Sequence, residues 1–114
     1  MRILIADDDE SIRGFLAACF EGNSQYTVTI VASGEEALDK IGKGEHFDLL
    51  LTDNDMGKTS GTDIAPIIKD WIPYVKIILM SGKDVSIEGL PIDYFLHKPF
   101  SFPLLLKKIK ELVE

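Results

Sequence analysis

Five short apolar runs rich in isoleucine, leucine and valine alternate with segments of helical periodicity along this chain. The runs span residues 2–6, 26–31, 47–52, 75–80 and 93–97. The first, third and fourth runs are almost continuously apolar, which is typical of central parallel strands covered on both faces. The second run alternates between apolar and polar residues, so we expect it at an edge of the sheet.

Between these runs, apolar residues recur at the spacing of a helix. In residues 10–22, for example, Ile12, Phe15 and Leu16 lie on one predicted helical face. The same criterion, with serines suited to capping at two of the starts, predicts further helices over residues 33–44, 62–72 and 101–114. The alternation of strands and helices predicts an α/β fold with one open parallel sheet and helices on both faces.

The connection between the last two predicted strands is short. It consists of SGKDVSIEGLPI, residues 81–92. A crossover needs about a dozen residues including its helix. We therefore expect a shortened helix here, of at most about two turns, interrupted by Gly89 and Pro91.

Length and composition indicate one globular domain over residues 1–114, because the 114-residue chain is 46% hydrophobic and 27% charged. The formal net charge of −7 argues against direct binding of nucleic acid or of an anionic membrane surface. The apolar runs are too short to span a bilayer. The single cysteine, Cys19, cannot form an internal disulfide, so a reducing cytoplasm is the expected location.

Charged and hydroxyl side chains collect directly after the predicted strands. They are Asp7, Asp8 and Asp9 after the first, Asp53 and Asp55 after the third, Ser81 after the fourth and Lys98 after the fifth. The carboxyl ends of parallel strands meet at one edge of a sheet, where ligands bind in folds of this class. The sequence therefore predicts that these residues come together.

Facing carboxylates repel one another, and a hard divalent cation relieves that repulsion, so the oxygen ligands favour Mg²⁺ over zinc. A carboxylate beside such a metal, a hydroxyl and a lysine has the groups that phosphoryl transfer needs, with Asp53 as the nucleophile. Each feature alone is more often a turn, a helix cap or a strand exit. Their occurrence at successive strand ends favours a functional site.

Four segments, taken in order, resemble the response regulator receiver domain, the CheY-like phospho-acceptor module of two-component signalling and phosphorelays. They are ILIADDDE, LLLTDNDM, IILMSG and FLHKPF, and the resemblance covers essentially the whole chain. It implies a flavodoxin-like (βα)5 fold, a doubly wound parallel sheet with strand order 2-1-3-4-5.

The resemblance also implies roles for individual residues. Asp53 would accept a phosphoryl group, as a phosphoprotein, from a sensor histidine kinase or a histidine phosphotransfer protein. The Mg²⁺ ligands would be Asp7 (through water), Asp8, Asp53 and the backbone carbonyl of Asp55.

Three further residues of this family pattern concern the switch. Ser81 and Lys98 would bind the phosphoryl group, and Ser81 and Phe95 would form the switch pair. Phe95 is open to a second interpretation, as a core aromatic of the last strand. The Lys98–Pro99 peptide bond would be cis.

Three features depart from the family pattern or vary within it. Gly57 stands where the family usually has proline, which predicts a looser loop over residues 57–61. The short crossover alters a region that the family uses for output. Asp55 and Lys83 occupy variable positions that tune phosphoryl lifetime in the family, and we expect them to form an ion pair that hinders attacking water.

Two rival functions remain open from sequence. One is a receiver-like binding module that works without phosphate. The other is an aspartyl phosphatase similar to the haloacid dehalogenases, with Asp53 attacking and Asp55 as general acid, although the acidic pair that this class carries after the lysine is missing. If the chain is a receiver domain and not a phosphatase, its expected catalysis is limited to self-catalysed phosphoryl transfer to Asp53 and autodephosphorylation.

The expected partners are proteins. Besides the phosphoryl donor, they include a downstream protein or an output domain outside this chain, and a homodimer is also open. The same reasoning predicts no direct contact with nucleic acid or membrane.

Overall fold

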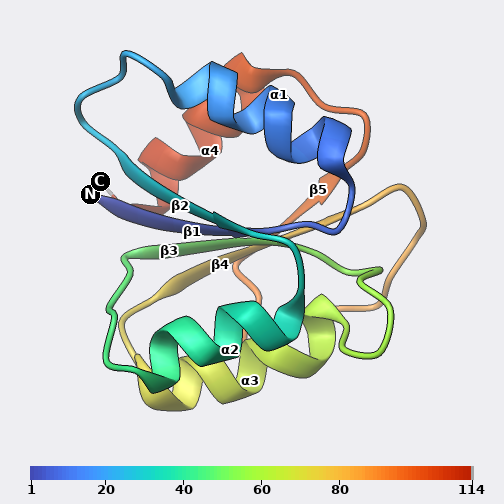
Figure 1. Cartoon of the computed structure of the whole chain (residues 1–114). Coiled ribbons are helices and arrows are strands. Elements are labelled where there is room, and N and C mark those ends of the chain that lie inside the picture. Colours follow the sequence, from blue (N-terminus) through green and yellow to red (C-terminus); the bar gives the residue numbers. More distant parts are fainter. Residues whose placement is uncertain (114) are drawn as a thin grey trace.

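The computed structural model describes residues 1–113 and contains one parallel five-stranded sheet between two layers of helices (Figure 1). The strands lie in the order β2-β1-β3-β4-β5. Helices α1 and α4 cover one face of the sheet, and α2 and α3 cover the other (Figure 1). The elements are β1 (Arg2–Ala6), α1 (Glu10–Phe20), β2 (Thr27–Val31), α2 (Gly34–Gly42), β3 (Leu49–Asp53), α3 (Gly61–Trp71), β4 (Lys76–Ser81), β5 (Tyr94–His97) and α4 (Phe102–Val113).

The three nearly continuous apolar runs form the central strands, as predicted. Successive side chains of a strand point to opposite faces, so each central strand supplies two cores. In β1, Leu4 and Ala6 enter the core beneath α2 and α3, while Ile3 and Ile5 enter the core beneath α1 and α4. Burial on both faces explains why these strands lack the alternation of an exposed sheet.

Helix starts are fixed by polar side chains that directly follow a strand or a short loop. Asp9 caps α1 by accepting a hydrogen bond from the Ser11 amide, and Ser33 caps α2. Ser60 and Asp63 form a capping box at α3, which begins at Gly61, one residue before the predicted start. The prediction that the last helix reaches residue 114 lies outside the described residues.

The segment between β4 and β5 contains no helix, so the predicted shortened helix is wrong. Gly89 adopts a positive φ of 77°, and turn hydrogen bonds run from the Leu90 amide to the Ile87 carbonyl and from the Ile92 amide to the Leu90 carbonyl. Residues 82–93 therefore cross back along the sheet as a loop. Within residues 1–113, the predicted fold class and strand order are confirmed, with four helices in place of five.

Over residues 1–113, the structure contains no helix with the length and apolarity needed to traverse a bilayer.

Candidate functional site

An acidic cluster lies where the carboxyl ends of β1 and β3 meet. Each of Asp7, Asp8 and Asp53 offers a carboxylate oxygen, and these oxygens all lie within 4.8 Å of one another. Asp7 is fully buried and Asp53 is 5% exposed, whereas Asp8 is exposed. Two of the three charges are therefore held away from water, which is costly unless a cation balances them.

Lys98, which directly follows β5, supplies one such charge. Its Nζ lies 2.8 Å from Asp7 Oδ2 and 3.0 Å from Asp53 Oδ1. These contacts join residues that are 91 and 45 positions apart in the chain. The predicted meeting of the strand ends thus holds for Asp7, Asp8, Asp53 and Lys98.

Burial and charge shift the ionisation of this cluster. Burial raises the pKa of Asp53, the hydrogen bond from Lys98 opposes that shift, and the charges of Asp7 and Asp8 add to it. For Lys98, burial lowers the pKa, but the hydrogen bonds and charges of Asp7 and Asp53 outweigh it, so the pKa is raised overall. The cluster holds more negative charge than a single lysine neutralises.

We expect Asp53→Asn to raise the melting temperature near pH 7 in metal-free buffer. Because the pKa of Asp53 is raised in the folded chain, its ionised form is less favourable there than in the unfolded chain. The gain should vanish as the pH falls below the ordinary aspartate pKa of 3.8, where the carboxyl is protonated in both states. Thermal melts of both proteins from pH 3 to pH 8 measure this; a variant less stable than wild type at pH 7 contradicts it.

The other two aspartates lie outside the cluster. Asp9 is the N-cap of α1, and its backbone amide donates to Asp7 Oδ1 at 2.9 Å, so the capping interpretation holds for this residue. The Asp55 side chain is exposed, and its Oδ2 lies 3.9 Å from Lys83 Nζ. The structure thus brings Asp55 and Lys83 together, as predicted, in an ion pair open to solvent.

Ser81 ends β4 and is fully buried. Its Oγ accepts a hydrogen bond from the Lys83 amide at 3.0 Å, and its carbonyl accepts one from the Lys98 amide at 2.9 Å. The Lys98–Pro99 peptide bond is cis, as expected. Ser81 is therefore hydrogen-bonded both to the loop that follows it and to Lys98, which pairs with two carboxylates of the acidic cluster.

Phe95 lies on β5, opposite Leu79 of β4 in the strand register. Its ring is half-buried and contacts the His97 ring, with 4.6 Å between centroids. Phe95 and His97 also line a cavity of about 420 Å³ with residues 84–87 of the crossover loop. Phe95 is therefore not a closed core residue, and the structure leaves space beside its ring.

Sequence reasoning missed two polar residues near the cluster. Arg13 Nη1 donates to the Asp7 carbonyl at 3.0 Å, and Asn54 Oδ1 accepts from the Thr62 amide at 3.1 Å. A helical arginine within two turns of the acidic run was a usable signal for the first contact. The sequence carried no comparable signal for the second.

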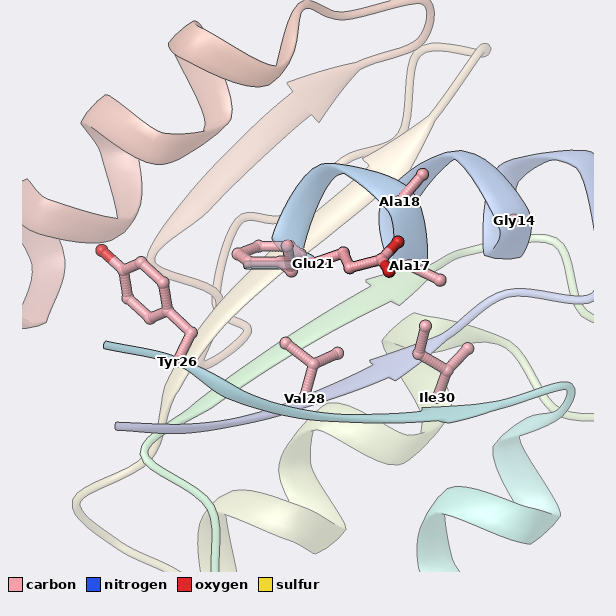
Figure 2. A pocket seen from close by; sticks show the side chains of 8 residues that line it. Gly14, Ala17, Ala18, Glu21, Tyr26, Val28 and Ile30 are labelled. Carbon is pink, nitrogen blue, oxygen red and sulfur yellow. The ribbon is translucent and has the colours of Figure 1, made fainter. Parts of the chain in front are cut away.

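A larger cavity of about 540 Å³ lies between α1 and β2 (Figure 2), and no residue of the acidic cluster lines it. Its lining is made mainly of small and apolar residues, such as Ala17, Ala18 and Val28, with the carboxylate of Glu21 beside them (Figure 2). One carboxylate does not provide the ligands of a metal or phosphate site. The acidic cluster at the sheet edge is therefore the better candidate site.

Comparison with known proteins agrees with the geometry. The family model described as response regulator receiver domain matches residues 3–110. The chain belongs to this family. It is a receiver domain of the kind found in two-component response regulators, and receiver domains interact with histidine kinases and output domains.

Two solved receiver domains resemble this receiver domain over nearly their whole length. A CheY-like receiver domain protein from Methanospirillum hungatei is 32% identical, with a TM-score of 0.90, and the match covers 98% of this chain and 92% of that one. The response regulator TrrA from Thermotoga maritima, solved in complex with Mg²⁺ and BeF, is 33% identical, with a TM-score of 0.83 and 97% of each chain covered.

The curated relatives are longer proteins. A 3′,5′-cyclic-nucleotide phosphodiesterase, regA of Dictyostelium discoideum, is 36% identical over the whole of this chain, which spans 15% of that enzyme. The chain spans about half the length of two regulatory proteins that it matches. The match to each of these proteins therefore covers only part of its length.

Proposed function

We propose that Asp53 is the phospho-acceptor of this receiver domain and that Mg²⁺ assists the transfer. The observation that carries the proposal is the pairing of Lys98 with two buried carboxylates at the sheet edge, Asp7 and Asp53. A structural ion pair needs one acid, whereas this cluster gathers three within 4.8 Å. That surplus of negative oxygen suits a hard divalent cation.

The donor set fits Mg²⁺ by its chemistry. Asp8 and Asp53 would ligate it directly, Asp7 through water, and the Asp55 backbone carbonyl would supply a further oxygen. Bound there, Mg²⁺ would neutralise charge on the transferred phosphoryl oxygens. The exposed side chain of Asp55 agrees with a role for its carbonyl in place of its carboxylate.

The transfer itself is a displacement at phosphorus. A carboxylate oxygen of Asp53 forms a bond to phosphorus while the bond to the donor breaks, which is the phosphorus–nitrogen bond when the donor is a phosphohistidine. The nitrogen keeps the bonding electron pair, and the imidazole leaves. Lys98 then pairs with a phosphoryl oxygen in place of the Asp53 oxygen that has reacted.

Ser81 and Phe95 would convert this chemistry into a change of shape. The Ser81 hydroxyl would turn to donate to a phosphoryl oxygen, and its Oγ would give up the bond from the Lys83 amide. That exchange would move the crossover loop, which lines the space beside Phe95. Because the new contacts exist only in the modified state, modification would shift an equilibrium between two conformations.

Titration with beryllium fluoride and Mg²⁺, a stable mimic of the phosphorylated state, tests this switch. Amide resonances of Ser81, Lys83 and Phe95 should shift in wild type and stay fixed in Asp53→Asn. Shifts confined to the acidic cluster would show that the crossover loop does not respond.

The Asp55–Lys83 ion pair would shield the phosphoryl group from water. Exposed pairs contribute about 1 kcal/mol or less, so we expect Asp55→Ala to speed autodephosphorylation by no more than about fivefold. Lys83→Ala should give the same increase, since either change removes the pair. Loss of ³²P from the purified phosphoprotein measures the rate, and an unchanged rate in both variants contradicts this role.

The partners follow from the chemistry. The phosphoryl donor would be a sensor histidine kinase or a histidine phosphotransfer protein, and the receiver of the signal would be an output domain, a separate protein or a second copy of the chain. We place these events in the cytoplasm, where a lone thiol such as Cys19 stays reduced.

A further inference from the structure

The loop from β3 to α3 carries the Asp55 carbonyl, one of the proposed Mg²⁺ ligands. It spans residues 54–60 and contains Gly57, which adopts a positive φ of 77°. Glycine at this position adds conformational freedom to the loop. A carbonyl on such a loop binds metal well only if the loop is fixed elsewhere.

Asn54 makes three contacts at the base of this loop. Its backbone amide donates to the Met80 carbonyl of β4 at 2.9 Å. Its carbonyl accepts from the Gly61 amide at 3.2 Å, and its side-chain Oδ1 accepts from the Thr62 amide at 3.1 Å. Asn54 therefore joins the end of β3 to the neighbouring strand and to the start of α3.

The two amides that donate hydrogen bonds to Asn54 are the first two of α3, and the first amides of a helix have no partner within it. The capping box of Ser60 and Asp63 satisfies the next amide, that of Asp63 itself. Asn54 thus accepts hydrogen bonds from helix amides on the other side of the loop and holds the two ends of the loop together. We call this pairing of residue 54 with residues 61 and 62 the neck of the loop. The Asn54 side chain adds the contact that the backbone alone cannot make.

We propose that Asn54 is a positioning residue that fixes the Asp55 carbonyl for Mg²⁺ by closing the neck of this loop. The inference rests on the proposed metal site. Gly57 makes the loop more flexible, and the Asn54 side chain, directly beside the proposed phospho-acceptor, would restore its rigidity. Residues that orient metal ligands in this way change affinity by about 10-fold or more when they are replaced.

Two measurements on Asn54→Ala test the inference, each compared with wild type. Hydrogen exchange at the Thr62 amide, followed by NMR, reports the neck directly and should accelerate by about 10-fold. The Mg²⁺ dissociation constant, from isothermal titration calorimetry, should rise by about 10-fold. Asn23→Ala, the same substitution in the turn between α1 and β2, is the matched control and should change neither quantity.

Asn54→Asp keeps an oxygen that can accept from the Thr62 amide and should restore slow exchange there. Asn54→Ser, which is too short for this contact but suits a turn, should behave as alanine does and serves if the alanine variant does not fold.

Faster exchange with unchanged Mg²⁺ affinity would overturn the positioning role, and so would unchanged exchange in the alanine variant. Wild type without measurable Mg²⁺ affinity would overturn the proposed metal site, and this inference with it. A metal site that binds normally in wild type and in Asn54→Ala overturns the inference alone.

Discussion

Lys98→Ala is expected to lower the free energy of unfolding by about 2–3 kcal/mol in metal-free buffer, because it leaves the buried carboxylates of Asp7 and Asp53 without their cation. The lysine side chain is 20% exposed, so solvent screens only part of this interaction. Urea titration with and without Mg²⁺ measures the effect. Added Mg²⁺ should stabilise the variant more than wild type, because the metal replaces the missing positive charge.

The difference in the free energy of unfolding between wild type and Lys98→Ala should depend on pH in one direction. The pKa of Lys98 is raised above its ordinary value of 10.5 in the folded chain, so its stabilising effect is complete below that value and is lost as the pH rises through the raised pKa. The difference in the free energy of unfolding between wild type and Lys98→Ala should therefore stay constant from pH 7 to pH 9. Lys43→Ala, which removes an exposed pair with Asp39, should leave the unfolding midpoint almost unchanged; an equal loss in both variants would contradict the role of Lys98.

Gly61→Ala should lower the free energy of unfolding by at least about 2 kcal/mol. A Cβ at this position would lie 2.5 Å from Leu79 Cδ1 and 2.7 Å from the Asp53 carbonyl oxygen, and a backbone atom cannot move aside as a side chain can. The substitution should therefore push α3 away from the end of β3 and weaken Mg²⁺ binding as well.

Gly14→Ala is the matched substitution in α1. Among residues 1–113, no atom outside the local helix lies within 4 Å of a Cβ placed there, so this change should stabilise the chain by about 0.5–1 kcal/mol. Chemical denaturation of both variants gives the comparison. A Gly61→Ala protein as stable as wild type would show that the approach of α3 to β3 is not tight.

The strands and their order were predictable because burial on both faces leaves a direct record in the sequence. The runs that became β1, β3 and β4 are almost continuously apolar, and the residues that directly follow parallel strands come together at one edge of the sheet. This is why Asp7, Asp53 and Lys98 could be placed at one edge before their contacts were known. Their spacing within that edge depends on side-chain packing, which periodicity does not record.

The errors lie where local preference and chain length compete. The twelve-residue connection was long enough for a short helix, but Gly89 and Pro91 favour turns, and the segment folds as a loop. Asn54 was missed for a different reason. Its role depends on the amide of Thr62, eight residues further along the chain, and only the returning path of the loop places that amide beside it.

The measurement that tests the central claim most directly is the intact mass after incubation with Mg²⁺ and acetyl phosphate, for wild type and Asp53→Asn. We expect wild type to gain the mass of one phosphoryl group when Mg²⁺ is present and to gain no mass when EDTA removes the metal. The Asp53→Asn variant should gain no mass in either condition. Steady release of inorganic phosphate without an adduct would indicate turnover, as in an aspartyl phosphatase. An adduct that persists in Asp53→Asn, or wild type that neither gains mass nor releases phosphate, would contradict the assignment of Asp53 as the phospho-acceptor.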